Sequence, residues 1–79
     1  LFRSVKAAFK LGFVLDKGRG VTPDVAEAIV WYRQAVAGGH PFAMYELGQH
    51  LARGQSLERD DVQARDLFRQ AAEKGNRAA

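Results

Sequence analysis

The feature that most constrains this 79-residue chain is an internal repeat with a period of 36 residues. Shifting the sequence by that distance aligns it with itself without a gap. The identical pairs include Ala7/Ala43, Leu11/Leu47, Gly12/Gly48, Leu15/Leu51, Gly18/Gly54, Asp24/Asp60, Ala28/Ala64 and Gly39/Gly75. Periods of this size are typical of solenoids, in which one unit buries its apolar face against a copy of itself. The repeat therefore predicts two stacked copies of a single structural unit.

Helix-cap residues set the boundaries of the two units. A polar N-cap followed by proline is typical of a helix start, and His40-Pro41 has this form. Ser4, another good N-cap residue, stands one period earlier. The resulting divisions are a single solenoid fragment over 1–79, repeat 1 at 4–39, repeat 2 at 40–75, and 76–79 as the start of a further repeat or a tail.

Each unit has the pattern of two amphipathic helices joined by a turn. Apolar residues recur at helical spacing over 5–17 and 25–38 and, one period later, over 41–53 and 61–74. Asp24 and Asp60 precede the second helices as N-caps, with Glu27 and Gln63 at the capping-box position. The pattern predicts an all-α fold, an α-α superhelix made of two antiparallel helical hairpins of about 36 residues each.

The repeated glycines have three different expected roles. Gly18 and Gly54 lie in the turn within each hairpin, and Gly39 and Gly75 lie just past the second helices, where a left-handed residue ends a helix. Gly12 and Gly48 fall inside the first helices, where glycine costs about 1 kcal/mol relative to alanine. Their recurrence predicts a neighbouring helix that approaches too closely for a methyl group.

Taken together, these positions resemble the Sel-1-like repeat, a relative of the tetratricopeptide repeat. The residues that carry the resemblance in the first unit are Ala7, Leu11, Gly12, Leu15, Gly18, Gly20, Val21, Asp24, Ala28, Trp31, Tyr32, Ala35 and Gly39. Tetratricopeptide repeats are the second choice, because their period is 34 and they lack the Gly-x-Gly turn. This chain departs from the family where Leu15 and Leu51 replace an aromatic residue and where Leu67-Phe68 replaces Trp31-Tyr32.

The resemblance implies a right-handed α-solenoid whose first helices line a concave face, and an adaptor or scaffold role that holds protein partners. It carries over no catalytic residue, because the shared motif is structural. It also implies flanking repeats in a longer parent chain, without which we expect this fragment to be marginally stable. The alternative function is a regulatory or recruiting appendage of an enzyme encoded elsewhere in that parent chain.

The remaining residues give no sign of an enzyme, a metal site or a cofactor. The chain has no cysteine, and its two histidines are far apart in the sequence. We interpret His40 as an N-cap and His50 as a helix residue without a metal-binding companion, because metal sites need three or four converging ligands. Asp60-Asp61 resembles a carboxylate pair but fits an N-cap followed by the first residue of a helix.

What remains is a surface for a protein or peptide partner. Charges of both signs are interspersed and sum to +3, which argues against a nucleic-acid partner, and no apolar run is long enough to cross a membrane. The sequence assigns the chain to no particular cellular compartment. If the first helices face the groove, the partner-binding residues are Lys6, Lys10, Phe13, Lys17, Phe42, Glu46, Gln49 and Arg53. The alternative is that the lysines simply form a solvated face.

Overall fold

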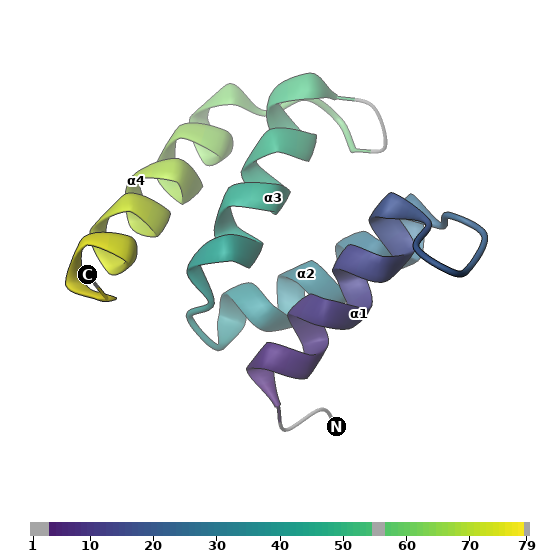
Figure 1. Cartoon of the computed structure of the whole chain (residues 1–79). Coiled ribbons are helices and arrows are strands. Elements are labelled where there is room, and N and C mark those ends of the chain that lie inside the picture. The colour runs from purple at the N-terminus through teal and green to yellow at the C-terminus, as the bar shows by residue number, and fades with distance from the viewer. Residues whose placement is uncertain (1–3, 55–56, 79) are drawn as a thin grey trace.

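The computed structural model describes residues 4–54 and 57–78, which form four α-helices and no strand. These helices are α1 (Val5–Lys17), α2 (Val25–Ala37), α3 (Pro41–Arg53) and α4 (Asp61–Ala78). α1 packs against α2 and α3 packs against α4, so that α3 lies between α4 and the first hairpin (Figure 1). The fold is the predicted all-α solenoid of two helical hairpins.

The helices begin where polar side chains accept hydrogen bonds from the first turn. The bonds are Ala7 N to Ser4 Oγ at 3.1 Å, Glu27 N to Asp24 Oδ1 at 3.1 Å, Ala43 N to His40 Nδ1 at 3.3 Å and Gln63 N to Asp60 Oδ1 at 3.0 Å. The capping box differs from the prediction in one respect. The Glu27 carboxylate accepts a bond from the Trp31 indole at 3.3 Å, because the next turn of the helix brings that donor within reach.

The turn within each hairpin has the same geometry in both copies. Gly18 and Gly54 end α1 and α3 in the left-handed region, with φ of 70° and 68°. Six residues after each turn glycine, a backbone hydrogen bond ties the chain back to the first helix. The Asp24 amide donates to the Leu15 carbonyl at 2.9 Å, and its counterpart Asp60 does the same at Leu51. The turn thus fixes where the second helix starts.

The glycines inside the first helices make room for an aromatic ring of the second helix. A Cβ on Gly12 would lie 2.8 Å from Tyr32 Cδ1 and 3.2 Å from the Ala28 carbonyl oxygen. A Cβ on Gly48 would lie 2.7 Å from Phe68 Cε1. The predicted close approach is therefore present in both hairpins, and the nearest atoms belong to an aromatic side chain.

The prediction that Gly75 ends the last helix is wrong. α4 continues through Gly75 to Ala78. The start of a further repeat or a tail over 76–79 stays a prediction, and residue 79 lies outside the described part. At the equivalent place in repeat 1, Gly39 takes φ of 85° and is followed by His40-Pro41. Proline disfavours helical backbone in the residue before it, and repeat 2 has no proline there.

The core fills the space inside and between the hairpins. Tyr32 and Leu47 are the largest fully buried side chains. Around them lie the other buried apolar residues, which are Ala8, Ala28, Ile29, Ala35, Ala43, Met44, Leu51, Ala64 and Leu67. None of the described helices is long and apolar enough to cross a membrane.

The helix glycines give a matched pair of stability predictions. Gly12→Ala should destabilise the fold by about 1–2 kcal/mol, because overpacking costs about 1–3 kcal/mol and the gain in helix propensity is about 1 kcal/mol. Gly48→Ala should cost less, because Phe68 is half-buried and its ring can shift, whereas Tyr32 is 0% exposed. Urea unfolding measures both.

The control for this pair is Gly75→Ala. No atom lies within 4 Å of a Cβ at this helical position, so the same change should stabilise the chain by about 1 kcal/mol. Equal destabilisation by all three substitutions would contradict the close-approach explanation.

Candidate functional site

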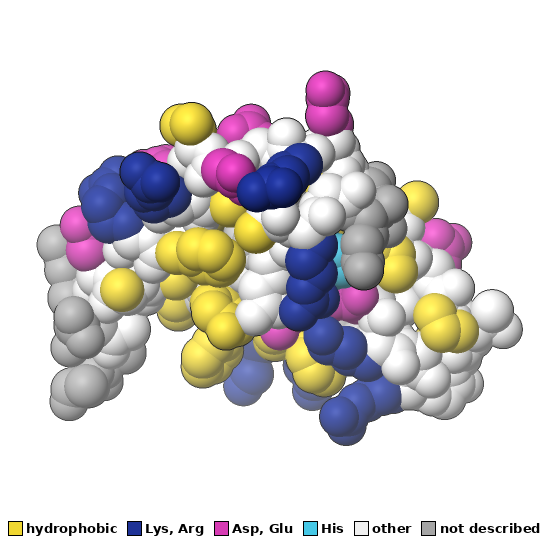
Figure 2. All heavy atoms as spheres, turned by 90° about the horizontal axis from the view of Figure 1, so that it is seen from above, with side chains coloured by type: hydrophobic (Ala, Val, Ile, Leu, Met, Phe, Trp, Pro, Cys, Tyr) yellow, Lys and Arg dark blue, Asp and Glu magenta, His cyan; other side chains and the backbone are white. Residues whose placement is uncertain are grey.

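The eight residues predicted to bind a partner come from α1 and α3, which lie on the same side of the molecule. Lys6, Lys10, Lys17, Phe42 and Arg53 are exposed, and Phe13, Glu46 and Gln49 are half-buried. Phe42 is 67% exposed, which is unusual for so large an apolar side chain. Figure 2 shows Lys and Arg side chains running as a band beside apolar ones. We call these eight residues the first-helix surface.

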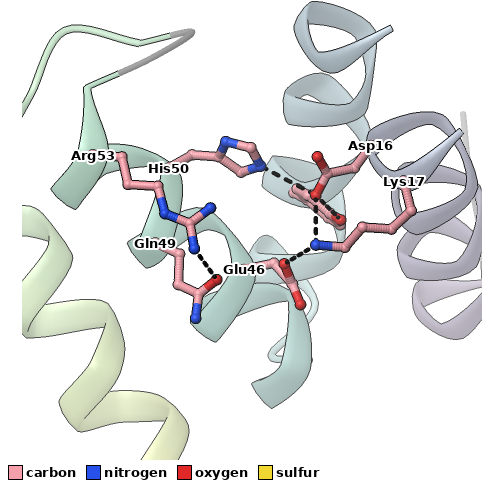
Figure 3. Close-up of polar contacts among 7 residues, drawn as sticks. Asp16, Lys17, Glu46, Gln49, His50 and Arg53 are labelled. Atoms are coloured by element: carbon pink, nitrogen blue, oxygen red, sulfur yellow. Dashed lines mark hydrogen bonds and ion pairs between the residues drawn. The ribbon is translucent and has the colours of Figure 1, made fainter. Parts of the chain in front are cut away.

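Contacts between α1 and α3 join the two halves of this surface. Lys17 Nζ lies 3.4 Å from Glu46 Oε1, which links the hairpins by an ion pair. The same ammonium lies 5.5 Å from the centre of the Phe13 ring, and the Arg19 guanidinium lies at 5.4 Å. At the far end of α3, Arg53 Nη2 donates to Gln49 Oε1 at 3.4 Å (Figure 3). We call the four cationic residues of the surface, Lys6, Lys10, Lys17 and Arg53, the basic band. Two of them, Lys17 and Arg53, are held in place by neighbouring side chains.

A stack of aromatic rings lies at the other end of the surface. The Phe9 ring stacks on the His40 ring with centroids 4.5 Å apart, and the centroid of the Phe42 ring lies 6.2 Å from that of Phe9. Burial lowers the pKa of His40, which keeps the imidazole neutral so that Nδ1 can accept the Ala43 amide. His40 therefore caps α3 and packs it on α1, the capping role predicted for it.

A buried polar cluster of Asp16, Tyr32 and His50 lies behind the first-helix surface, between α1, α2 and α3 (Figure 3). Asp16 Oδ2 accepts a hydrogen bond from the Tyr32 hydroxyl at 2.8 Å and lies 3.1 Å from His50 Nε2. It also lies 3.6 Å from Lys17 Nζ. The cluster connects both helices of the first hairpin to the second hairpin.

The protonation states follow from these contacts. Burial raises the pKa of Asp16, but the hydrogen bonds from His50 and Tyr32 lower it more, so the net pKa is below 3.8 and the group is a carboxylate. Burial and the bond to Asp16 raise the pKa of Tyr32, which stays a donor. The His50 Nδ1 atom is buried without a partner, which suits the tautomer with its proton on Nε2.

Sequence reasoning missed this cluster because two of its members, Asp16 and His50, do not repeat. The counterparts of Asp16 and His50 are Ala52 and Val14, so neither residue belongs to the family motif. The sequence nevertheless contained an indication of this contact. Both residues lie on the apolar side of their helices, and a buried polar group needs a partner of complementary charge. Asp16 and His50 were the residues able to satisfy one another.

The cluster has the chemistry of a structural contact. An aspartate that orients a histidine is also found in hydrolases, but there the histidine faces an accessible nucleophile. Here the third member is a fully buried tyrosine that donates to the aspartate itself. Among residues 4–54 and 57–78, no three His, Cys, Asp or Glu side chains are placed to hold a metal ion.

Comparison with known proteins identifies both units. The family model described as Sel1 repeat matches residues 5–40 and again 41–76. Among curated proteins, "Chitin synthase regulatory factor 2" of Schizosaccharomyces pombe is 38% identical over 61 residues. That match covers 76% of this chain and 12% of the yeast protein.

Two solved structures have the same fold. A Sel1 repeat protein from Oxalobacter formigenes superposes with a TM-score of 0.84 at 31% identity, over 90% of this chain and 29% of that one. The protective antigen c5321 of uropathogenic Escherichia coli, described as displaying an SLR fold, also has a TM-score of 0.84, at 35% identity, over 90% of this chain and 15% of the antigen. The chain thus spans less than a third of each of these three proteins.

The buried carboxylate predicts a loss of stability in acid. Because the folded-state pKa of Asp16 lies below its ordinary 3.8, its contribution is complete above pH 3.8 and is lost as the pH falls through the lowered value. Asp16→Asn should flatten this part of the profile and cost about 1–3 kcal/mol at pH 7. Urea unfolding from pH 7 to pH 2 measures both effects. Asp61→Asn, at an exposed carboxylate, is the control and should leave most of the acid transition in place.

A second pH effect is expected from the N-cap of α3. Since burial lowers the pKa of His40 below 6.5, its contribution is complete above pH 6.5 and declines as the pH falls and the capping nitrogen is protonated. His40→Asn keeps a capping oxygen that does not titrate, so stability should become flat between pH 7 and pH 5. A slope unchanged by this substitution would contradict the neutral-cap assignment.

Proposed function

The chain belongs to the Sel1 repeat family, and on this basis we propose that it is a non-catalytic scaffold or adaptor module that binds a protein partner on the first-helix surface. Sel1 repeats generally mediate protein–protein interaction, and proteins built from them are typically non-catalytic. The partner contacts the α1 and α3 residues of both hairpins at once, in the way that solenoids bind through equivalent positions of successive repeats.

The observation that carries the proposal is the composition of this surface. Among its eight residues, four are cationic and one is anionic, and the anion, Glu46, is already paired with Lys17. Phe42 adds a large exposed apolar side chain next to this positive charge. Such a surface is complementary to a helix or an extended segment that carries both acidic and apolar side chains.

A regulatory role is the second candidate. Its specific support is the name of the yeast relative, "Chitin synthase regulatory factor 2", which describes a protein that regulates an enzyme. In this form of the proposal the partner is an enzyme, or the module recruits substrates for an enzyme domain of the same parent protein. The surface and its chemistry are the same in both candidates.

Site-specific photo-crosslinking tests which face of the molecule binds the protein partner. A photoreactive residue at Gln49, on the first-helix surface, should capture a protein partner in cells that produce the chain. The same residue at Val30, which is 53% exposed on α2, should not. Equal capture from both positions would contradict the assignment of the face.

Charge reversal then tests the chemistry of recognition. The double variant Lys6→Glu/Lys10→Glu should weaken binding of the captured partner about tenfold or more, with unchanged helicity by circular dichroism. Lys6 and Lys10 suit this test better than Lys17, whose ammonium supports Asp16 and Glu46. Unchanged affinity would rule out the basic band as the binding determinant. A steep dependence of nucleic-acid binding on salt would instead identify phosphate as its ligand.

A further inference from the structure

The first-helix surface has a cluster of aromatic rings where α1 and α3 begin. The ring centroids of His40 and Phe42 lie 5.8 Å apart, and those of Phe9 and Phe42 lie 6.2 Å apart. We call Phe9, His40 and Phe42 the aromatic end. Phe42 is its most exposed member, whereas the other two side chains are half-buried. This end therefore offers ring surface to an apolar side chain of a partner.

The opposite end, where α1 and α3 finish, carries cations on three separate elements. Lys17 lies in the last turn of α1, and Arg53 lies in the last turn of α3. Arg19, in the turn that follows α1, is not one of the eight predicted residues. Its guanidinium lies 5.4 Å from the centre of the Phe13 ring, and the Lys17 ammonium lies 5.5 Å from the same ring. We call Phe13, Lys17, Arg19 and Arg53 the basic end.

The positive charge of the basic end is only partly compensated within the molecule. Arg59 and Arg69, on the side of α4, are paired with acidic neighbours. Lys17 shares its ammonium between two carboxylates. Within residues 4–54 and 57–78, by contrast, Arg19 and Arg53 make no ion pair. Two exposed guanidinium groups are therefore available to carboxylates of another molecule.

Neighbouring hairpins leave these positions of the repeat exposed. Lys17 is exposed although the second hairpin lies beside α1, and its counterpart Arg53 is exposed although the first hairpin lies beside α3. The same holds for Lys6 and its counterpart Phe42. Both positions are thus open on a helix that has a hairpin after it and on a helix that has a hairpin before it.

Helix geometry gives the separation of the two ends. Phe42 lies in the first turn of α3 and Arg53 is its last residue, so a rise of 1.5 Å per residue places them about 16 Å apart. An extended segment covers this distance in about five residues, whereas a helix needs about eleven. The extended form therefore orders fewer residues upon binding. Because the cations lie on three elements and do not converge on one point, separate carboxylates suit them better than one doubly charged phosphate.

We propose that the first-helix surface binds an extended acidic segment in a fixed orientation. A large apolar side chain of the segment lies on Phe42 at the aromatic end, and two carboxylates about five residues away lie at the basic end, where they pair with Arg19 and Arg53. The proposal rests on the proposed function and adds the chemistry and the direction of the bound segment. It also assigns Arg19 to the binding residues.

Fluorescence polarisation with a labelled synthetic peptide tests the chemistry. The probe peptide consists of Trp, a spacer of about four Gly and Ser residues, and two Glu, and it should bind the folded chain with a Kd below about 1 mM. Replacement of both Glu by Lys, or of Trp by Gly, should weaken binding at least about fivefold. A probe that does not bind at about 1 mM, or equal binding of the three peptides, would overturn the proposal.

Variants of the chain test each end separately. Arg19→Glu and Arg53→Glu should each weaken binding of the probe at least about fivefold, whereas Arg33→Glu, a matched change at an exposed position of α2, should not. Phe42→Ser should also weaken binding, with Val30→Ser on α2 as its control. The double variant Arg19→Glu/Arg53→Glu should prefer the Lys peptide to the Glu peptide, a reversal that a loss of folding does not produce. Equal effects of Arg19→Glu and Arg33→Glu would contradict the assignment of Arg19.

Crosslinking of the same probe measures its orientation. A photoreactive group beside Trp should label residues 40–45, and one beside the two Glu should label residues 17–20 and 49–54. Labelling of the same residues from both places, or labelling in the reverse order, would overturn the fixed orientation. A peptide with phosphoserine in place of the two Glu that binds about tenfold tighter than the probe would overturn the choice of carboxylates.

Failure of this proposal and failure of the proposed function give different results. If Gln49 captures a protein partner in cells but the probe does not bind, the first-helix surface binds a segment of other chemistry. If Gln49 and Val30 capture a partner equally, the assignment of the face itself is wrong.

Discussion

The packing of this molecule depends most on one side chain, that of Tyr32, which has no exposed surface. Its ring lies over Gly12 and so sets how closely the helices of the first hairpin approach. Its hydroxyl donates to Asp16, which in turn lies within hydrogen-bond distance of His50 on α3. Packing within the first hairpin and docking of the second hairpin are therefore coupled through a single residue.

This coupling has a clear energetic basis. A phenol hydroxyl and a carboxylate that are buried without partners each cost several kcal/mol, whereas the hydrogen bonds that pair them in the cluster contribute a modest net stability. Asp16 and Tyr32 are paired within the first hairpin, and the contact with His50 is added when the second hairpin docks. Apolar packing between repeats would be nearly as favourable at a range of crossing angles, whereas directional hydrogen bonds favour one angle. The cluster restricts how the second hairpin can lie on the first.

Much of the fold could be predicted because the information that specifies it is local and occurs twice. The bounds of α1 and α3 follow from Ser4, His40-Pro41 and the turn glycines, which cap and end helices by themselves. The error at Gly75 has the same origin. Glycine permits a left-handed helix end but does not require one. Pro41, two residues after Gly39, disfavours helical backbone at His40, and repeat 2 has no proline at that position. The repeat suggested that Gly75 ends a helix as Gly39 does, but the sequence that follows the two glycines differs.

The site could be predicted less completely, for the opposite reason. The first-helix surface could be proposed from the sequence because α1 and α3 occupy equivalent places in the two units, which predicts a shared face without knowledge of any contact. The Asp16–His50 contact joins residues 34 positions apart that break the repeat, and only the packing of α3 on the first hairpin brings them together. Residues that depart from a repeat thus say little about the fold. Here, however, Asp16 and His50 determine how the two hairpins contact each other.

The contacts between the two hairpins matter for the proposed scaffold. A surface made of two stacked helices binds a partner tightly only if the spacing between the helices is set beforehand, because ordering it upon binding reduces the affinity. The Lys17–Glu46 ion pair, the stack of Phe9 on His40 and the buried cluster all lie between α1 and α3 or directly behind them. Lys6 and Lys10 on one helix and Phe42 on the other are consequently held at a defined separation before any partner arrives. The same contacts that join the repeats therefore also preorganise the face that they present.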